Sequence, residues 1–196
     1  MADESALPRI AHRETVYDGW GRMLKLQIRL RDGSTLTREV EDHGQATGVL
    51  AYDPERRVAL LVRQLRAAVL MTTGEPEVLE AIAGLLDEDD PEAGARREAD
   101  EEAGLRLGPL ERVVCAHSMP GISSERIHLF LASYTAADRT GQGGGVETEG
   151  ENITVSEIPL AELARMADEG RVPDMKTMLL VQTLRLRRPD LFAPRA

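Results

Sequence analysis

Three carboxylates of the chain are spaced so that they could bind a divalent metal ion together. Glu98, Glu101 and Glu102 stand at positions i, i+3 and i+4, and in an α-helix this spacing places them on one face with about 5–6 Å between Cβ atoms. Clustered carboxylate oxygens suit hard cations such as Mg²⁺ or Mn²⁺, whose charge would also offset the repulsion between the glutamates. The alternative is an acidic helix face that is simply solvated. The spacing alone does not decide between the two.

The segment around these glutamates carries the signals of a helix that starts near Pro91 and stops at Gly104. Asp89 and Asp90 are candidate caps, a proline is tolerated in a first helical turn, and a glycine is a common stop. We therefore expect a helix of about three to four turns at this point.

The segment 84–105 resembles the Nudix box, whose pattern is G-x5-E-x7-R-E-U-x-E-E-x-G-U, where U is a bulky apolar residue. The core R-E-x-x-E-E-x-G is intact at 97–104. Three positions depart from the pattern: the loop before the helix is one residue shorter, Asp89 or Asp90 stands for the first glutamate, and Ala99 stands for the first bulky residue. The core is specific enough to favour a metal-binding helix.

The resemblance covers most of the chain, from about Leu24 to Leu184. It is closest to the Nudix enzymes that hydrolyse nucleoside diphosphate sugars of the GDP-mannose and ADP-ribose type. The segments that carry it are Leu61 to Arg66, Glu80 to Gly84, Ser118 to Gly121 with Glu125, Gly143 to Glu147, and Asp174 to Thr177.

The resemblance implies an Mg²⁺-dependent enzyme, with Mn²⁺ as a substitute, that cleaves the pyrophosphate bond of a nucleoside diphosphate sugar. GDP-mannose, giving GMP and mannose 1-phosphate, is the first candidate substrate. The alternatives are ADP-ribose as substrate and a catalytically silent sensor that binds a sugar nucleotide. Because silent members usually lose glutamates of the box, and this chain keeps them, we expect an enzyme.

The resemblance also implies roles for individual residues. The residues expected to be catalytic are Arg97, Glu98, Glu102 and Glu151. Arg97 would hold a neighbouring carboxylate in place. The catalytic base is expected among Glu147, Glu149 and Glu151, and Glu151 is chosen because Glu151-Asn152-Ile153 best matches the Glu-Asp-Ile of the related enzymes. The expected metal ligands are Glu98, Glu101, Glu102, Glu151 and the backbone carbonyl of Ala83.

Substrate contacts follow from the same resemblance. Arg66 and Lys176 would stabilise charge on the phosphates, and Trp20 or Tyr17 could stack on the base, although a lone aromatic is more often packing. The residues expected to bind substrate are Arg38, Glu39, Arg66, Gly84, Glu125 and Lys176.

The elements that must position these residues predict an α+β fold. Alternating apolar residues on both sides of Asp32-Gly33 indicate a hairpin over 22–40. Stretch 67–76 has no clear period and predicts an irregular loop, and the glycine-rich 141–150 predicts a mobile surface loop. Further strands are expected at 46–52, 57–62, 110–116, 126–134 and 153–158, and helices at 160–169 and 174–187.

The family resemblance adds a domain assignment to these elements. It implies a β-rich extension over residues 1–42, exchanged between the subunits of a homodimer, and a Nudix α/β/α sandwich over residues 43–196. The length of 196 residues is sufficient for one domain with such an extension.

Composition excludes several other classes of protein. Lys and Arg number 24 against 34 Asp and Glu, a formal net charge of -10, so nucleic-acid binding is not expected and a diphosphate would need metal ions or a local basic cluster. The single Cys115 excludes an intrachain disulfide and a multi-cysteine zinc site. The single cysteine also fits a reducing compartment, so we expect a cytoplasmic protein. No apolar run approaches the roughly 18 residues that a membrane span needs, so no membrane partner is expected.

Overall fold

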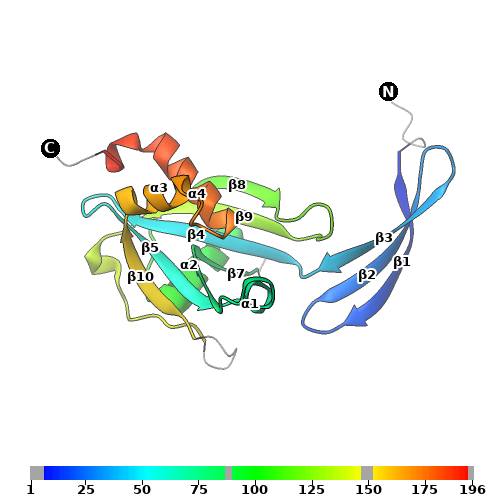
Figure 1. Ribbon diagram of the computed structural model, residues 1–196, viewed down its shortest axis with the longest axis horizontal. Helices are drawn as coiled ribbons and strands as arrows, with labels where there is room; N and C mark the ends of the chain where they lie inside the picture. The colour runs from blue at the N-terminus through cyan, green and yellow to red at the C-terminus, as the bar shows by residue number, and fades with distance from the viewer. Residues whose placement is uncertain (1–6, 87–89, 147–151, 194–196) are drawn as a thin grey trace. The chain divides into compact units, whose positions relative to one another are not determined.

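The computed structural model describes residues 7–86, 90–146 and 152–193. By their internal contacts the residues form two compact units (Figure 1). The first unit comprises Met1–Gln45 with Ala116–Ile127, and the second comprises Ala46–Cys115 with His128–Ala196.

The first unit is built on a three-stranded antiparallel sheet in the order β1-β2-β3. Its strands are β1 (Arg9–Asp18), β2 (Arg22–Arg29) and β3 (Thr35–Asp42). The predicted hairpin is confirmed as β2 and β3, whose turn contains Gly33 at φ 82° and a bond from the Ser34 N–H to Asp32 Oδ1 of 2.9 Å. Strand β1 was not predicted, because all ten of its residues are exposed and no buried face imposes an alternating pattern.

The segment 116–127 belongs to this unit through the end of β3. The Glu41 N–H donates to the Ile122 carbonyl at 2.8 Å, and the Ser124 N–H donates to the Glu41 carbonyl at 2.9 Å. The Ser124 hydroxyl also donates to Asp42 Oδ1 at 2.7 Å. The loop is therefore joined to β3 by backbone and side-chain bonds.

The second unit contains a seven-stranded sheet in the order β10-β5-β4-β9-β8, with β6 paired to β5 and β7 paired to β4. The central strands β4 and β5 are buried along most of their length, as expected where both faces of a sheet are covered. The strands are β4 (Gln45–Asp53), β5 (Val58–Leu65), β6 (Glu77–Glu80), β7 (Ile82–Leu85), β8 (Glu111–His117), β9 (Arg126–Ser133) and β10 (Thr154–Pro159).

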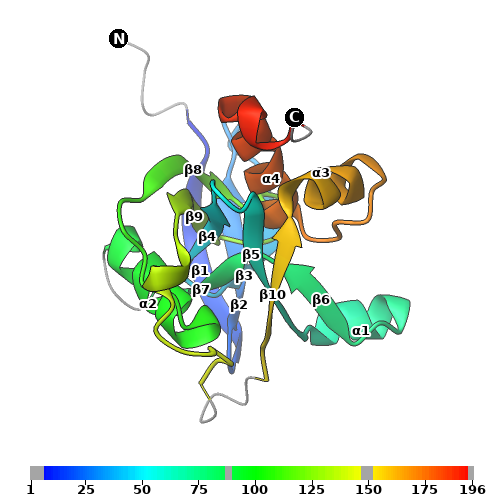
Figure 2. The same ribbon diagram turned by 90° about the vertical axis from the view of Figure 1, so that its left-hand side faces the viewer.

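Helices cover both faces of this sheet. Figures 1 and 2 show α2 (Pro91–Ala103) on one face and α3 (Leu160–Asp168) with α4 (Met175–Arg187) on the other. Helix α2 presents small residues to the core, and Ala99, the departure from the bulky residue of the box, is fully buried there with Leu60 and Ile82. The predicted α/β/α sandwich is thus confirmed.

Three short elements differ from the sequence-based expectation. The stretch 67–76 contains helix α1 (Ala67–Thr73), which ends at the left-handed Gly74, and the strands β6 and β7 follow it. None of the residues of α1 is buried, so the helix leaves no apolar period in the sequence. The two strands have four residues each, which is too short for a clear alternation.

The predicted strands and helices elsewhere are confirmed within a few residues of their bounds. In the described part of the chain, no helix combines the length and hydropathy that crossing a bilayer requires.

Candidate active site

The carboxylates of helix α2 lie against strand β7. Asp90 caps the helix by accepting a 2.9 Å bond from the Glu92 N–H, and the helix stops at the left-handed Gly104. Glu98 and Glu102, one turn apart, are only 7% and 1% exposed. Glu102 Oε2 accepts a 3.2 Å bond from the N–H of Ala83 in β7. Two of the three helix glutamates that were predicted as metal ligands therefore share a buried face.

Gly84 leaves the space that the Glu98 carboxylate occupies. A Cβ built on Gly84 would lie 2.2 Å from Oε1 of Glu98, far inside the contact distance. The structure thus gives Gly84, predicted as a substrate-binding residue, a visible steric reason to lack a side chain.

Arg97 binds two of the glutamates beside it. Its Nη2 lies 2.8 Å from Glu98 Oε1 and its Nη1 lies 2.9 Å from Glu101 Oε2. Nη2 also donates to the Leu85 carbonyl at 3.1 Å, which ties the guanidinium to the end of β7. Such charge-assisted bonds fix the orientation of a carboxylate, as the resemblance implied.

Gln64 is a site residue that the sequence analysis missed. It is 8% exposed in β5, and its Nε2 donates to Glu102 Oε1 at 3.2 Å. A polar residue near the end of a mostly apolar strand was the available signal, because buried polar groups require a partner.

The oxygen donors of this region suit a divalent cation. Two buried carboxylates against β7, with a third on the same helix, form a set of hard oxygen ligands. The Glu98 carboxylate lies so close to Gly84 that a Cβ there would clash with it. Glu98 and Glu101 are bound to Arg97, and within the described residues no group of three or more His, Cys, Asp or Glu side chains is arranged to hold a metal ion. The residues that could hold one here are Glu98, Glu101, Glu102 and the carbonyl of Ala83.

The glycine-rich segment is bonded to the end of α2. The Gly144 N–H donates to the Glu102 carbonyl at 3.0 Å, and the Gly145 N–H donates to the Glu101 carbonyl at 3.1 Å. Gly143 adopts φ +70°, and a Cβ on it would lie 2.3 Å from the Glu102 carbonyl oxygen. The described part of this stretch, 141–146, is therefore tied to the helix rather than a free surface loop.

The candidate bases lie outside the described residues, so the choice of Glu151 stays a prediction. The chain resumes beside the same helix end, because the Ile153 N–H donates to the Gly144 carbonyl at 3.1 Å.

Arg66 and Lys176 both bind the buried Glu80. Arg66 Nε donates to Glu80 Oε1 at 2.7 Å, and Lys176 Nζ binds Glu80 Oε2. Burial alone would lower the pKa of Arg66, but the hydrogen bond and the charge of Glu80 outweigh it, so the pKa is raised above its ordinary value. Arg66 and Lys176 belong to the same unit as the glutamates.

The other predicted substrate residues belong to the first unit. Arg38 and Glu39 are exposed neighbours in β3, and Arg38 Nη1 donates to the adjacent Thr37 carbonyl at 2.8 Å. Glu125 is half-buried in the loop, where its N–H donates to Ser123 Oγ at 3.1 Å. Arg66, Gly84 and Lys176 therefore belong to the same unit as the helix glutamates. Arg38, Glu39 and Glu125 belong to the unit of the N-terminal sheet.

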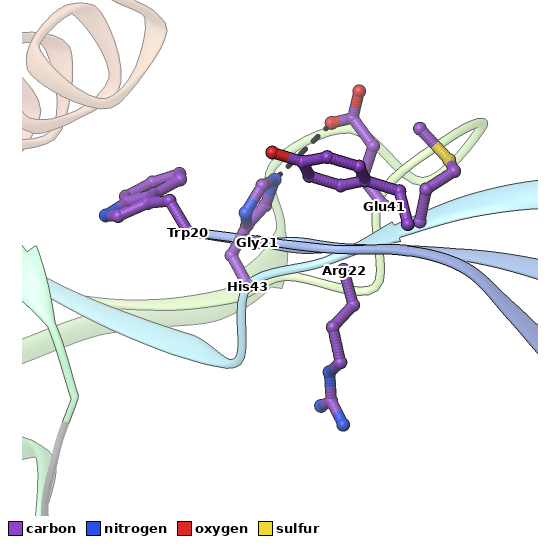
Figure 3. Close-up of a pocket in the computed structure, with 7 residues that line it drawn as sticks. Trp20, Gly21, Arg22, Glu41 and His43 are labelled. Atoms are coloured by element: carbon purple, nitrogen blue, oxygen red, sulfur yellow. Dashed lines mark ion pairs between the residues drawn. The ribbon is translucent and has the colours of Figure 1, made fainter.

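The first unit contains a pocket of about 270 Å³ (Figure 3). Trp20 is 82% exposed, and its ring centroid lies 5.1 Å from that of His43. His43 Nε2 in turn lies 3.5 Å from Glu41 Oε2, whereas Arg22 points to the other side of the strand (Figure 3). The residues that line the pocket are Tyr17, Trp20, Gly21, Arg22, Met23, Glu41 and His43.

Comparison with known proteins identifies the relatives of this chain. A family model described as "NUDIX domain" matches residues 42–179. The chain is 41% identical over 170 residues to a GDP-mannose pyrophosphatase of Cronobacter sakazakii, covering 85% of this chain and 87% of that protein. It is 40% identical over 148 residues to a GDP-mannose pyrophosphatase of Citrobacter koseri, covering 75% and 76%.

A solved structure shares the fold. The chain superposes on the crystal structure of an ADP compounds hydrolase with a TM-score of 0.75 at 17% sequence identity, covering 94% of this chain and 95% of that one. At this identity the similarity concerns the fold alone.

Proposed function

Since the chain belongs to the NUDIX family, we propose that it is a metal-dependent pyrophosphatase that cleaves a nucleoside diphosphate sugar into a nucleoside monophosphate and a sugar 1-phosphate. GDP-mannose is the first candidate substrate, because relatives at 36–41% identity carry the name GDP-mannose pyrophosphatase. Its products would be GMP and mannose 1-phosphate.

The observation that carries this proposal is the buried pair Glu98 and Glu102 against β7, in one unit with the cations Arg66 and Lys176. A pyrophosphate bridge carries two negative charges, and the chain has a net charge of -10. Its binding therefore needs local positive charge, which Mg²⁺ and these two side chains would supply.

The reaction is a hydrolysis at one phosphorus. Mg²⁺, or Mn²⁺ in its place, would be held by Glu98, Glu101, Glu102, the Ala83 carbonyl and Glu151. It would supply Lewis-acid polarisation of a phosphoryl oxygen. A water molecule forms the new P–O bond, Glu151 accepts its proton, and the bond from that phosphorus to the bridging oxygen breaks. Arg66 and Lys176 stabilise charge on the phosphate oxygens.

Arg97 acts through orientation in this scheme. Its bonds to Glu98, Glu101 and the Leu85 carbonyl hold the helix face to β7. We assign it as a positioning residue for the metal carboxylates.

The residues of the first unit that the resemblance assigned to substrate are proposed for contacts outside the diphosphate. We propose that Arg38, Glu39 and Glu125 contact the nucleotide or sugar, with Trp20 or Tyr17 stacking on the base. Residues 1–42 would be exchanged within a homodimer, as the family resemblance implies. The exposure of Ile10, Val16 and Tyr17 at 50% or more supports an interface on this sheet.

Purified protein should convert GDP-mannose to GMP in the presence of Mg²⁺, and EDTA should stop the reaction. Glu102→Gln should lower kcat by about 10³-fold, because a carboxylate ligand of the metal ion would be lost. Glu92→Gln is the matched control, since Glu92 is an exposed glutamate on the same helix, and it should retain the wild-type rate.

The same assay distinguishes the alternatives. A higher kcat/KM on ADP-ribose than on GDP-mannose would reassign the substrate, and tight binding of either without turnover would favour the silent sensor. Equal rates with and without EDTA would contradict the metal-dependent mechanism.

A further inference from the structure

Glu80 is a buried carboxylate that binds two cations, one on each oxygen. It lies at the end of β6 and is 2% exposed. Arg66 Nε bonds to its Oε1 at 2.7 Å, and Lys176 Nζ bonds to its Oε2. Because the two cations come from the start of α1 and the start of α4, Glu80 is the group that holds them together.

The start of α4 is fixed to the same place by further bonds. Asp174 caps the helix by accepting a 3.0 Å bond from the Thr177 N–H, and its carboxylate lies 3.1 Å from Lys176 Nζ. The Thr177 hydroxyl oxygen accepts a 2.6 Å bond from the N–H of Ala81, the residue after Glu80. The backbone that carries Lys176 is therefore anchored to the β6–β7 junction independently of the lysine side chain.

Both cations retain hydrogen-bond donors for a ligand. Arg66 donates to Glu80 through Nε, and within the described residues neither of its terminal nitrogens donates a hydrogen bond. The Arg66 side chain is 41% exposed, and that of Lys176 is 15% exposed, whereas the Glu80 side chain is 3% exposed. A dissolved anion can reach the cations while the carboxylate stays buried.

We propose that Glu80 is a positioning residue that holds Arg66 and Lys176 as a pair for the diphosphate of the substrate. The proposal deepens the proposed function and rests on it for the identity of the ligand. Two like charges on long side chains repel and explore many rotamers when nothing holds them. By binding both, Glu80 orders them before the ligand arrives, so less ordering remains to be done at binding.

A positioning role and a mere counter-ion role predict opposite effects. If Glu80 only neutralised the cations, its removal would strengthen their attraction for a diphosphate. If it positions them, its removal weakens binding. Glu80→Gln is the decisive change, because a glutamine of the same size can accept a bond from one cation with its oxygen but turns an N–H₂ group toward the other.

The experiment measures binding of methylenediphosphonate, a non-hydrolysable diphosphate, to the full chain by calorimetry in Mg²⁺, together with KM and kcat on GDP-mannose. Glu80→Gln should weaken the binding about 10-fold and raise KM by a similar factor, with kcat changed less than about 3-fold. Glu80→Asp keeps the charge on a side chain that is shorter by one methylene, so it should weaken binding less than Glu80→Gln does. Glu77→Gln is the matched control, since Glu77 is an exposed glutamate on the same strand.

A second comparison tests whether Glu80 acts through the arginine. The effects of Glu80→Gln and Arg66→Gln on methylenediphosphonate binding should be less than additive in the double variant. Unchanged or tighter binding in both Glu80 variants would overturn the proposal, as would fully additive effects or a loss confined to kcat. Thermal melting of each variant shows whether the fold is retained.

The binding experiment distinguishes failure of the positioning role from failure of the proposed function. If the wild-type protein turned over no sugar nucleotide, the proposed function would fail, while the methylenediphosphonate series would still decide the role of Glu80. If turnover were normal and Glu80→Gln bound the probe like the wild type, the positioning role alone would fail.

Discussion

Two clusters in the second unit use the same pair, an arginine on a buried carboxylate, with different consequences. In the phosphate cluster (Glu80, Arg66 and Lys176), Arg66 Nε binds Glu80. In the turn cluster (Asp53, Arg56, Tyr134 and Glu157), Arg56 Nε binds Asp53 at 2.5 Å, and its two terminal nitrogens bind Glu157 at 2.7 and 2.8 Å. All three guanidinium nitrogens of Arg56 thus bind protein groups, whereas in the described part of the chain the two terminal nitrogens of Arg66 donate no hydrogen bond.

The turn cluster joins three elements of the fold. Asp53 ends β4 and accepts bonds of 2.9 Å from the N–H groups of Glu55 and Arg56 in the following turn. Glu157 belongs to β10 and accepts a 2.7 Å bond from the hydroxyl of Tyr134, the residue after β9. Burial and this bond raise the pKa of Tyr134 above its ordinary value. The two clusters therefore differ in their spare hydrogen-bond donors, and under the proposed function these spare donors are the groups that bind the diphosphate.

The largest effect is expected at Arg66, which the proposed function assigns to the diphosphate. Arg66→Gln should lower kcat/KM on GDP-mannose about 100-fold, roughly 2.7 kcal/mol of transition-state binding, because a charged contact to phosphate is lost. The melting temperature should fall by only a few degrees, because the buried Glu80 would still be paired with Lys176 in the variant. A large loss of stability with normal kcat/KM would break the distinction between the clusters.

Arg56→Gln should show the reverse pattern. It leaves Asp53, 3% exposed, without its charged partner, and urea unfolding should show a loss of about 1–2 kcal/mol. The figure is moderate because the Arg56 side chain is 41% exposed and water screens it. The folded variant should keep kcat/KM within about 2-fold of the wild type. A loss of activity without a loss of stability would show that the turn cluster communicates with the site.

The smallest effect concerns pH. Bonds from Arg56 hold the pKa of Glu157 below its ordinary value of 4.5. A carboxyl whose pKa is depressed by folding stabilises the protein fully above the unfolded pKa, and this contribution is lost as pH falls through the folded pKa. The free energy of unfolding, measured from pH 6 downward, should therefore fall more steeply below about pH 4.5. Glu157→Gln should reduce the slope of this fall with pH. An identical slope in the variant would exclude this source of acid sensitivity.

The sequence predicted the elements whose signals lie within a few residues of one another. Helix α2 was predicted with its cap and stop, because Asp90, Pro91 and Gly104 act within a few residues of the helix ends. The shared face of Glu98 and Glu102 followed from helical spacing. Helix α1 and strands β6 and β7 were missed, since an exposed or very short element imposes no periodic pattern.

By itself, then, the sequence determined the family, the α+β class and the carboxylate face of α2. Only the tertiary structure decided the partners across that site: Gln64 meets Glu102 from 38 positions away, and Lys176 meets Glu80 from 96. The physical reason is that a local signal requires residues on one element. Contacts between a strand and a distant helix depend on how the sheet and helices pack. Packing imposes no fixed sequence separation on the residues in contact, so the sequence carries no pattern that predicts them.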